Sequence, residues 1–121
     1  MKIEYEDFDF FDYYYNNSLK IFYIEDIEEA EDFYRKNAYE VANLCFDAVK
    51  VGMKYDLIEV AAFRFCICGR MAMVNIERDK FDDTLKKCIK TFEEYEEYEK
   101  CQEAMEIIND DPLIKSETSN S

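Results

Sequence analysis

The longest apolar stretch of the chain runs from Leu57 to Ile76, LIEVAAFRFCICGRMAMVNI, near the middle of its 121 residues. A helix of about twenty residues is long enough to cross a bilayer. Four side chains in the stretch are polar: Glu59, Arg64, Arg70 and Asn75. Because each charge at membrane depth costs about 2.5–3.5 kcal/mol, these residues argue against a membrane span. The stretch is therefore predicted to be the buried central helix of a small soluble domain.

The predicted central helix begins after Asp56 as N-cap and carries one narrow polar stripe. The stripe consists of Glu59, Arg70 and Glu77. Arg64 falls almost opposite the stripe, among apolar side chains, so we expect it to pair with a carboxylate or to extend toward solvent. Gly69 lies in mid-helix, which predicts the close approach of a neighbouring backbone or a kink.

The composition favours helices. Hydrophobic residues make up 49% of the chain, and two Gly and one Pro are too few for a turn-rich β protein. The predicted fold class is all-α, or mainly α: a small helical bundle around the central helix, with a C-terminal helical hairpin. We expect residues 1–109 to form a single helical domain. Residues 110–121 are polar and contain the proline, which predicts a disordered tail.

A first amphipathic helix is predicted between Asp26 and Gly52. Asp26 as N-cap, with Glu29 three residues later, is a capping-box arrangement. The apolar positions share an arc of about 100° on a helical wheel. They are Ile27, Ala30, Tyr34, Ala38, Val41, Cys45, Ala48 and Val49. Gly52 is the predicted C-cap that stops this helix.

Residues 80–109 have helical periodicity, but their apolar positions fall into two sets. The first set lies within about 80° of arc on a helical wheel: Phe81, Leu85, Cys88, Phe92 and Tyr95. The second set is rotated from the first by about 140°: Tyr98, Cys101, Met105 and Ile108. A straight helix would present two nearly opposite apolar faces. We therefore predict a break near Glu96 and Glu97 and an antiparallel helical hairpin.

Residues 1–24 allow two interpretations. Residues 2–5 and 19–24 have the composition of strands, and Asn16-Asn17-Ser18 is typical of a turn, which predicts a short two-stranded β-element. Six residues of the same segment also fall at helical spacing: Tyr5, Phe8, Phe11, Tyr15, Leu19 and Phe22. Both interpretations stay open from the sequence.

Part of the predicted hairpin is similar to a known motif. Tyr98-Glu99-Lys100-Cys101-Gln102, followed by Met105-Glu106 and Ile108, resembles the second helix of the helical hairpin of the UvrB/UvrC type. The Arg-Asp pair of that motif is replaced here by Met105-Glu106. Such hairpins associate with proteins, so the resemblance implies contact with a partner or with a second copy of the chain.

The net charge of the chain is −14, and it is unevenly distributed. Residues 1–40 carry −8, residues 41–80 carry +1, and residues 81–121 carry −7. An acidic surface repels nucleic acids and anionic membranes and attracts basic protein surfaces. We therefore expect no direct binding to nucleic acid or to a membrane. Whether the acidity serves binding or only solubility stays open.

Residue types that carry most enzyme chemistry are missing. The chain has no His, the commonest general base and a frequent zinc ligand, and its two Gly cannot form a phosphate-binding loop. The five cysteines are Cys45, Cys66, Cys68, Cys88 and Cys101. On a helix Cys66 and Cys68 would point about 160° apart, so we expect reduced core thiols rather than a zinc site or disulfides. The sequence thus predicts a non-enzymatic protein with no cofactor and no metal. The acidic N-terminus lacks the features of a signal peptide, which favours the cytoplasm.

Two functions fit this pattern. In the first, carboxylates imitate nucleic-acid phosphates and occupy a basic groove of a nucleic-acid-binding enzyme or complex. Small phage-encoded inhibitors of restriction or CRISPR systems resemble this chain in size, charge and lack of catalytic residues. In the second, the protein is a helical adaptor or homodimer that binds through its C-terminal hairpin. The predicted acidic partner-binding residues are Glu4, Glu6, Asp7, Asp9, Asp12, Glu93, Glu94, Glu96, Glu97 and Glu99. The predicted aromatic ones are Tyr13, Tyr14, Tyr95 and Tyr98.

Overall fold

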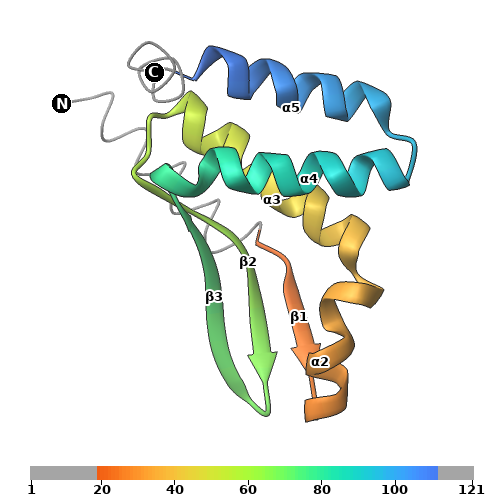
Figure 1. Ribbon diagram of the computed structural model, residues 1–121. Coiled ribbons are helices and arrows are strands. Elements are labelled where there is room, and N and C mark those ends of the chain that lie inside the picture. The colour runs from red at the N-terminus through yellow and green to blue at the C-terminus, as the bar shows by residue number, and fades with distance from the viewer. Residues whose placement is uncertain (1–18, 112–121) are drawn as a thin grey trace, which may run out of the picture.

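The computed structural model describes residues 19–111, which form an α+β fold: a three-stranded sheet with the helices stacked beyond it (Figure 1). In chain order the elements are β1 (Ile21–Ile24), α2 (Ile27–Lys36), α3 (Ala38–Lys54), β2 (Glu59–Ile67), β3 (Arg70–Glu77), the 3-10 turn η2 (Arg78–Lys80), α4 (Phe81–Glu94) and α5 (Tyr98–Asp110). The prediction of an all-α or mainly α bundle around a central helix is wrong, because the longest apolar stretch of the chain is a β-hairpin.

Strands β2 and β3 pair antiparallel and occupy most of the predicted central helix. Cys68 and Gly69 form the turn between them, with φ of 50° and 82°. Positive φ at both positions is what a two-residue turn of type I′ requires. Gly69 therefore closes a hairpin, and the predicted helix kink or helix crossing at this residue is wrong. With this stretch in two strands, no helix among residues 19–111 is both long and apolar enough to cross a membrane.

A bulge in β2 explains why the strand shows no clear alternation in sequence. The pairing register shifts between Ala61 and Phe63, so Ala62 is an extra residue in the ladder. Residues 60–63 are all buried, and a continuous apolar run is hard to distinguish from a buried helix. Beyond the bulge the alternation returns. Phe63 and Phe65 pack into the core, and the residues between and after them face the other side of the sheet.

Arg64 lies between Phe63 and Phe65 on β2 and therefore on the opposite sheet face from these two core side chains. Its Nε is nevertheless buried and has no hydrogen-bond partner among residues 19–111. Its Nη2 donates a hydrogen bond to the carbonyl oxygen of Leu19 at 3.1 Å. No carboxylate within residues 19–111 forms an ion pair with Arg64. A backbone carbonyl thus takes the place of the expected carboxylate and ties the start of β1 to the sheet.

Strand β1 pairs in parallel with β2, and the register places Ile21 opposite Arg64. Helices α2 and α3 join the two strands, since parallel neighbours need a crossover connection. The strand interpretation is confirmed for β1, and the helical alternative is wrong at Leu19 and Phe22. Residues 2–5, the other predicted strand, lie outside the described residues.

The first predicted helix is two helices, α2 and α3, with a break at Asn37. Its start is confirmed, because Oδ1 of Asp26 accepts a hydrogen bond from the backbone N–H of Glu29 at 2.8 Å. The Glu29 carboxylate accepts in turn from the N–H of Glu25 at 3.0 Å, one residue before the capping-box position. Ile27 is 77% exposed, so the predicted apolar seam does not include the first turn of α2.

Gly52 lies inside α3, which continues to Lys54, so the predicted stop at this glycine is wrong. After the C-cap Tyr55, Asp56 takes a left-handed conformation with φ of 52° and terminates the helix. The N–H of Leu57 donates to the carbonyl of Gly52 at 2.9 Å, which completes a Schellman motif. Asp56 therefore ends α3 and is not the N-cap of a following helix. Gly52 serves packing, because a Cβ at this position would lie 2.6 Å from the ring of Phe81.

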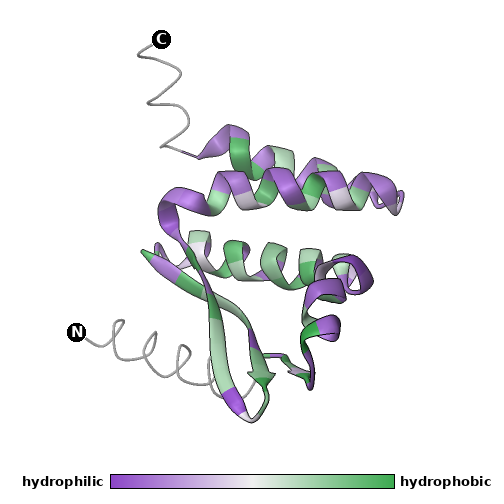
Figure 2. Cartoon of the chain, turned by 60° about the horizontal axis from the view of Figure 1, so that its bottom comes forward, coloured by the Kyte–Doolittle hydropathy of each residue, from purple (hydrophilic) through white to green (hydrophobic). Residues whose placement is uncertain are grey.

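The core lies between the sheet and the helices. Helix α3 packs against β2, α4 packs against α3, and α5 packs against α4 (Figure 1). Phe46 of α3 and Phe92 of α4 are buried and meet edge to face, with 5.5 Å between ring centroids. Phe33 of α2 packs in the same way against Phe22 of β1 and Phe65 of β2, at 4.8 Å in both cases. Figure 2 shows apolar residues concentrated along the β-hairpin and α3, and hydrophilic residues along α2 and α5.

The predicted C-terminal helical hairpin is confirmed, with α4 and α5 separated by residues 95–97. Four residues of the first apolar set are buried: Phe81, Leu85, Cys88 and Phe92. The second set faces inward only in part. Ile108 is buried, whereas Tyr98 is 63% exposed and Met105 is 45% exposed. Ala104, which is not a member of the set, is buried as well. The inward face of α5 is thus shifted from the predicted one toward Ala104.

Candidate functional site

Seven predicted partner-binding residues come together where α4 turns into α5, at the end of the molecule where α3 begins (Figure 1). We call this region the hairpin tip. It comprises Glu93, Glu94, Tyr95, Glu96, Glu97, Tyr98 and Glu99. The other seven predicted residues lie outside the described residues: Glu4, Glu6, Asp7, Asp9, Asp12, Tyr13 and Tyr14.

The hairpin tip presents aromatic rings and carboxylates together on one surface. Tyr95 is 54% exposed and Tyr98 is 63% exposed. The exposed glutamates of the tip are Glu93, Glu94, Glu96 and Glu99. Within residues 19–111 none of these four has an ion-pair partner. The tip is therefore a cluster of uncompensated negative charge around two rings that are accessible to a partner.

Contacts with α3 hold the tip in place. The hydroxyl of Tyr39 donates a hydrogen bond to Oε1 of Glu97 at 2.6 Å. The rings of Tyr39 and Tyr95 pack with 4.8 Å between centroids. Nζ of Lys100 donates to Oδ1 of Asn43 at 2.6 Å and lies 5.3 Å from the centroid of the Tyr39 ring. The tip is thus ordered before any partner arrives, which lowers the entropy lost on binding.

The backbone of the tip is a second Schellman motif. The N–H of Glu97 donates to the carbonyl of Phe92 at 2.8 Å, and the N–H of Glu96 donates to the carbonyl of Glu93 at 3.1 Å. Glu96 occupies the left-handed position, with φ of 60°. This position is usually glycine, because a side chain there costs about 1–2 kcal/mol. The exposed side chain of Glu96 therefore lies at a position where the left-handed backbone conformation favours glycine.

Helix α2 carries a second group of acidic residues. Tyr39, which braces the tip, lies in the first turn of α3 and follows α2 closely in the chain. The exposed acidic residues from the start of α2 are Glu25, Asp26, Glu28, Glu29 and Glu31. In Figure 1 the start of α2 lies beside the end of β1, at the sheet, whereas the hairpin tip lies on the other side of α3.

The cysteines do not form a second site of chemistry. All five are free thiols, and Cys66 and Cys68 lie on β2 and in the hairpin turn, so their predicted helical positions are wrong. Burial raises the pKa of Cys45 to about 11 and that of Cys88 to about 12, which keeps both thiols protonated at neutral pH. Among residues 19–111 no three metal-ligating side chains form a group that could hold a metal ion.

One ion pair ties the C-cap residue of α5 to η2, the turn that precedes α4. Nη1 and Nη2 of Arg78 donate to the two carboxylate oxygens of Asp111, at 3.2 and 2.8 Å. Asp111 is fully buried, although the predicted tail begins at residue 110. The Asp82 carboxyl lies nearby, and its pKa is raised to about 6 by burial and by Asp111. Arg78, Asp82 and Asp111 thus lie at one end of the helical hairpin, and the tip lies at the other end.

The residues that brace the tip from outside it, Tyr39, Asn43 and Lys100, were not among the predicted site residues. Tyr39 and Glu97 lie 58 positions apart, and Asn43 and Lys100 lie 57 apart, so no short motif connects them. One of these residues could have been noticed in the sequence: Lys100 is the sole basic residue between positions 91 and 114, among many glutamates. No protein-family model, no curated protein and no solved structure matches the chain.

Proposed function

We propose that this protein is non-enzymatic and binds, through the hairpin tip, a basic surface of a nucleic-acid-binding enzyme or complex. In this proposal it is an inhibitor of the phage type, directed against CRISPR or restriction systems. Its carboxylates take the place of nucleic-acid phosphates, and it acts in the cytoplasm of the host cell.

One observation carries the proposal: two exposed tyrosines stand among four unpaired glutamates on a turn that is already braced. Aromatic rings supply much of the binding energy at protein interfaces. Unpaired carboxylates at one turn repel one another, and a basic partner would relieve that repulsion. Lys and Arg side chains that contact phosphates are suited to such a surface.

Charge neutralisation at the tip tests the proposal. The variant Glu94→Gln, Glu96→Gln, Glu99→Gln removes three negative charges from the tip. The matched control removes three exposed charges elsewhere, through Glu77→Gln, Asp79→Asn and Glu106→Gln. Affinity capture from a candidate host lysate at low and high salt identifies the partner, and titration with the purified partner then compares the three proteins.

We expect the unmodified protein and the control to capture a nucleic-acid-binding protein that is released by salt, because exposed charges are screened within about 8–10 Å at physiological ionic strength. The tip variant should bind at least tenfold more weakly. Duplex DNA or guide RNA should compete with the unmodified protein for the partner. Equal loss of affinity in the tip and control variants, or a partner that binds DNA and this protein at the same time, would refute the proposal.

A homodimer through the helical hairpin is the second candidate function. Tyr98 and Met105 lie seven residues apart on α5, which places them on one side of the helix, and both are exposed. Sedimentation of the full chain distinguishes the two functions. A dimer whose mass is insensitive to salt and is reduced to a monomer by Met105→Glu supports the dimer. A monomer at micromolar concentration supports the first proposal.

A further inference from the structure

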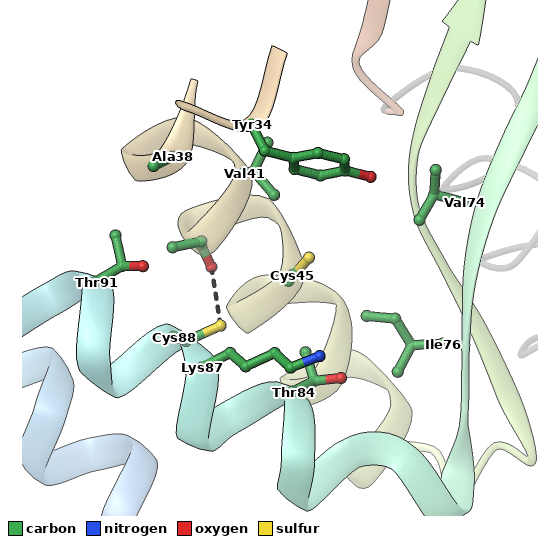
Figure 3. A pocket seen from close by; sticks show the side chains of 11 residues that line it. Tyr34, Ala38, Val41, Cys45, Val74, Ile76, Thr84, Lys87, Cys88 and Thr91 are labelled. Carbon is green, nitrogen blue, oxygen red and sulfur yellow. Dashed lines mark hydrogen bonds between the residues drawn. The ribbon is translucent and has the colours of Figure 1, made fainter. Parts of the chain in front are cut away.

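A pocket of about 470 Å³ lies between α3, α4 and β3 (Figure 3). Its apolar lining comes from four elements: Tyr34 of α2, Val41 and Cys45 of α3, Val74 and Ile76 of β3, and Cys88 of α4. The volume falls within the range of about 300–1,000 Å³ that is typical of small-molecule sites. We call this cavity the α3–α4 pocket.

The deep part of the α3–α4 pocket offers few polar groups to a ligand. The Cys88 thiol donates a hydrogen bond to the carbonyl oxygen of Ala42 at 3.4 Å, so its hydrogen is already engaged. Cys45 and Cys88 both remain protonated at neutral pH because burial raises their pKa. Ile76 and Cys88 are buried. This part of the pocket therefore suits an apolar chain.

The α4 side of the pocket carries the one charge in its lining, Lys87. Figure 3 shows this side chain extended along the pocket with its ammonium group toward Thr84, which lies one helical turn earlier. Within residues 19–111 Lys87 has no ion-pair partner. In a chain of net charge −14, an unpaired ammonium beside an apolar cavity whose lining contains no carboxylate is complementary to an anionic ligand.

We propose that the α3–α4 pocket binds a small carboxylic acid with an apolar chain, of the medium-chain fatty acid class. The chain fills the space between Val41, Cys45 and Ile76, and the carboxylate pairs with Lys87 and accepts a hydrogen bond from the Thr84 hydroxyl. Sugars and nucleotides do not suit the pocket, because its apolar walls would leave their polar groups unpaired. This site is separate from the hairpin tip, so it stands independently of the proposed function.

Titration calorimetry of the full chain with decanoate tests the site. Lys87→Gln should weaken decanoate binding about tenfold, the factor expected for loss of a charge-assisted hydrogen bond. Lys86→Gln is the matched control, because it makes the same change of charge on the same helix at a residue that does not line the pocket. Decanol has the same chain without the charge, and it should bind the unmodified protein and Lys87→Gln equally well.

Thiol modification gives a second readout that needs no variant. Cys45 lines the pocket, whereas Cys68 is exposed in the turn between β2 and β3. Bound decanoate should slow the reaction of N-ethylmaleimide with Cys45 at least fivefold and leave that of Cys68 unchanged. The proposal is overturned if decanoate does not bind, if Lys86→Gln and Lys87→Gln weaken binding equally, or if decanoate leaves the labelling of Cys45 unchanged.

Discussion

Replacing Gly52 by alanine is expected to destabilise the protein, although the same change usually stabilises a helix. Gly52 lies inside α3, where Ala is favoured over Gly by about 1 kcal/mol. The new Cβ would lie 2.6 Å from Cζ and 2.7 Å from Cε2 of Phe81, well inside van der Waals contact. The Phe81 ring would have to move by about 1 Å to restore an ordinary separation.

The surroundings of Phe81 decide the sign of the change. The side chain is fully buried, and the guanidinium of Arg78 lies 5.2 Å from the ring centroid. The ring therefore has no open space to enter, and overpacking of this kind costs about 1–3 kcal/mol. With the helix-propensity gain subtracted from the upper part of that range, we expect Gly52→Ala to lower the free energy of unfolding by about 1–2 kcal/mol.

Urea denaturation followed by circular dichroism measures this change, and two further sets of variants isolate its cause. Asp47 is exposed in the same helix. The difference in unfolding free energy between Asp47→Ala and Asp47→Gly therefore measures the helix propensity of Ala relative to Gly alone, about 1 kcal/mol. In a Phe81→Leu background the clash is removed, and Gly52→Ala should become neutral or stabilising. A Gly52→Ala protein as stable as the unmodified one would refute the argument that this glycine is required for packing.

Three further changes test other parts of the fold. Cys68→Asn should stabilise the protein by about 0.5–1 kcal/mol in the same denaturation assay, because Asn-Gly suits a turn with two positive φ angles. Asp111→Asn should destabilise it by about 2–4 kcal/mol, because it leaves Arg78 without its carboxylate, and loss of helicity in α5 should appear first in hydrogen exchange. Asp82 has a folded pKa of about 6, above its usual value of 3.8, so the folded state binds the extra proton between these values and stability should fall as pH rises through that interval. Between pH 4 and pH 7 the free energy of unfolding should therefore fall by about 1 kcal/mol, after allowance for solvent screening. Denaturation at the two pH values measures this change, and it should be absent in Asp82→Asn.

The helical hairpin could be predicted because the residues that specify it are close together in the sequence. Phe81, Leu85 and Phe92 keep one phase on a helical wheel, and the change of phase occurs at the turn itself. Since the turn and its neighbours are contiguous in sequence, the residues of the hairpin tip were predicted together. Their bracing partner Tyr39 was not, because it joins the tip only through the packing of α3 on α4.

The sheet was missed because each of its local signals is weak. The bulge at Ala62 hides the alternation of β2, and the hairpin turn has Cys where Asn or Asp would be typical. The parallel pairing of Ile21 with Arg64 depends on a crossover that no local pattern reveals. The helix ends were mispredicted for a similar reason. The left-handed residues that terminate α3 and α4 are Asp56 and Glu96, which are not glycines, while Gly52 lies inside a helix.

The two groups of acidic residues, in α2 and at the hairpin tip, differ in how they relate to stability. In α2, Asp26 and Glu29 accept backbone hydrogen bonds and lie at the positive end of the helix dipole, so their charges stabilise the fold. At the hairpin tip, Glu96 occupies a position where glycine would be more stable, and its carboxylate has no ion-pair partner within residues 19–111. Two exposed tyrosines in the same turn reduce solubility rather than increase it. Folding and solubility therefore explain the charge of α2. At the tip, neither folding nor solubility explains the left-handed Glu96 and the two exposed tyrosines, and in the proposed function these residues serve to bind a basic partner.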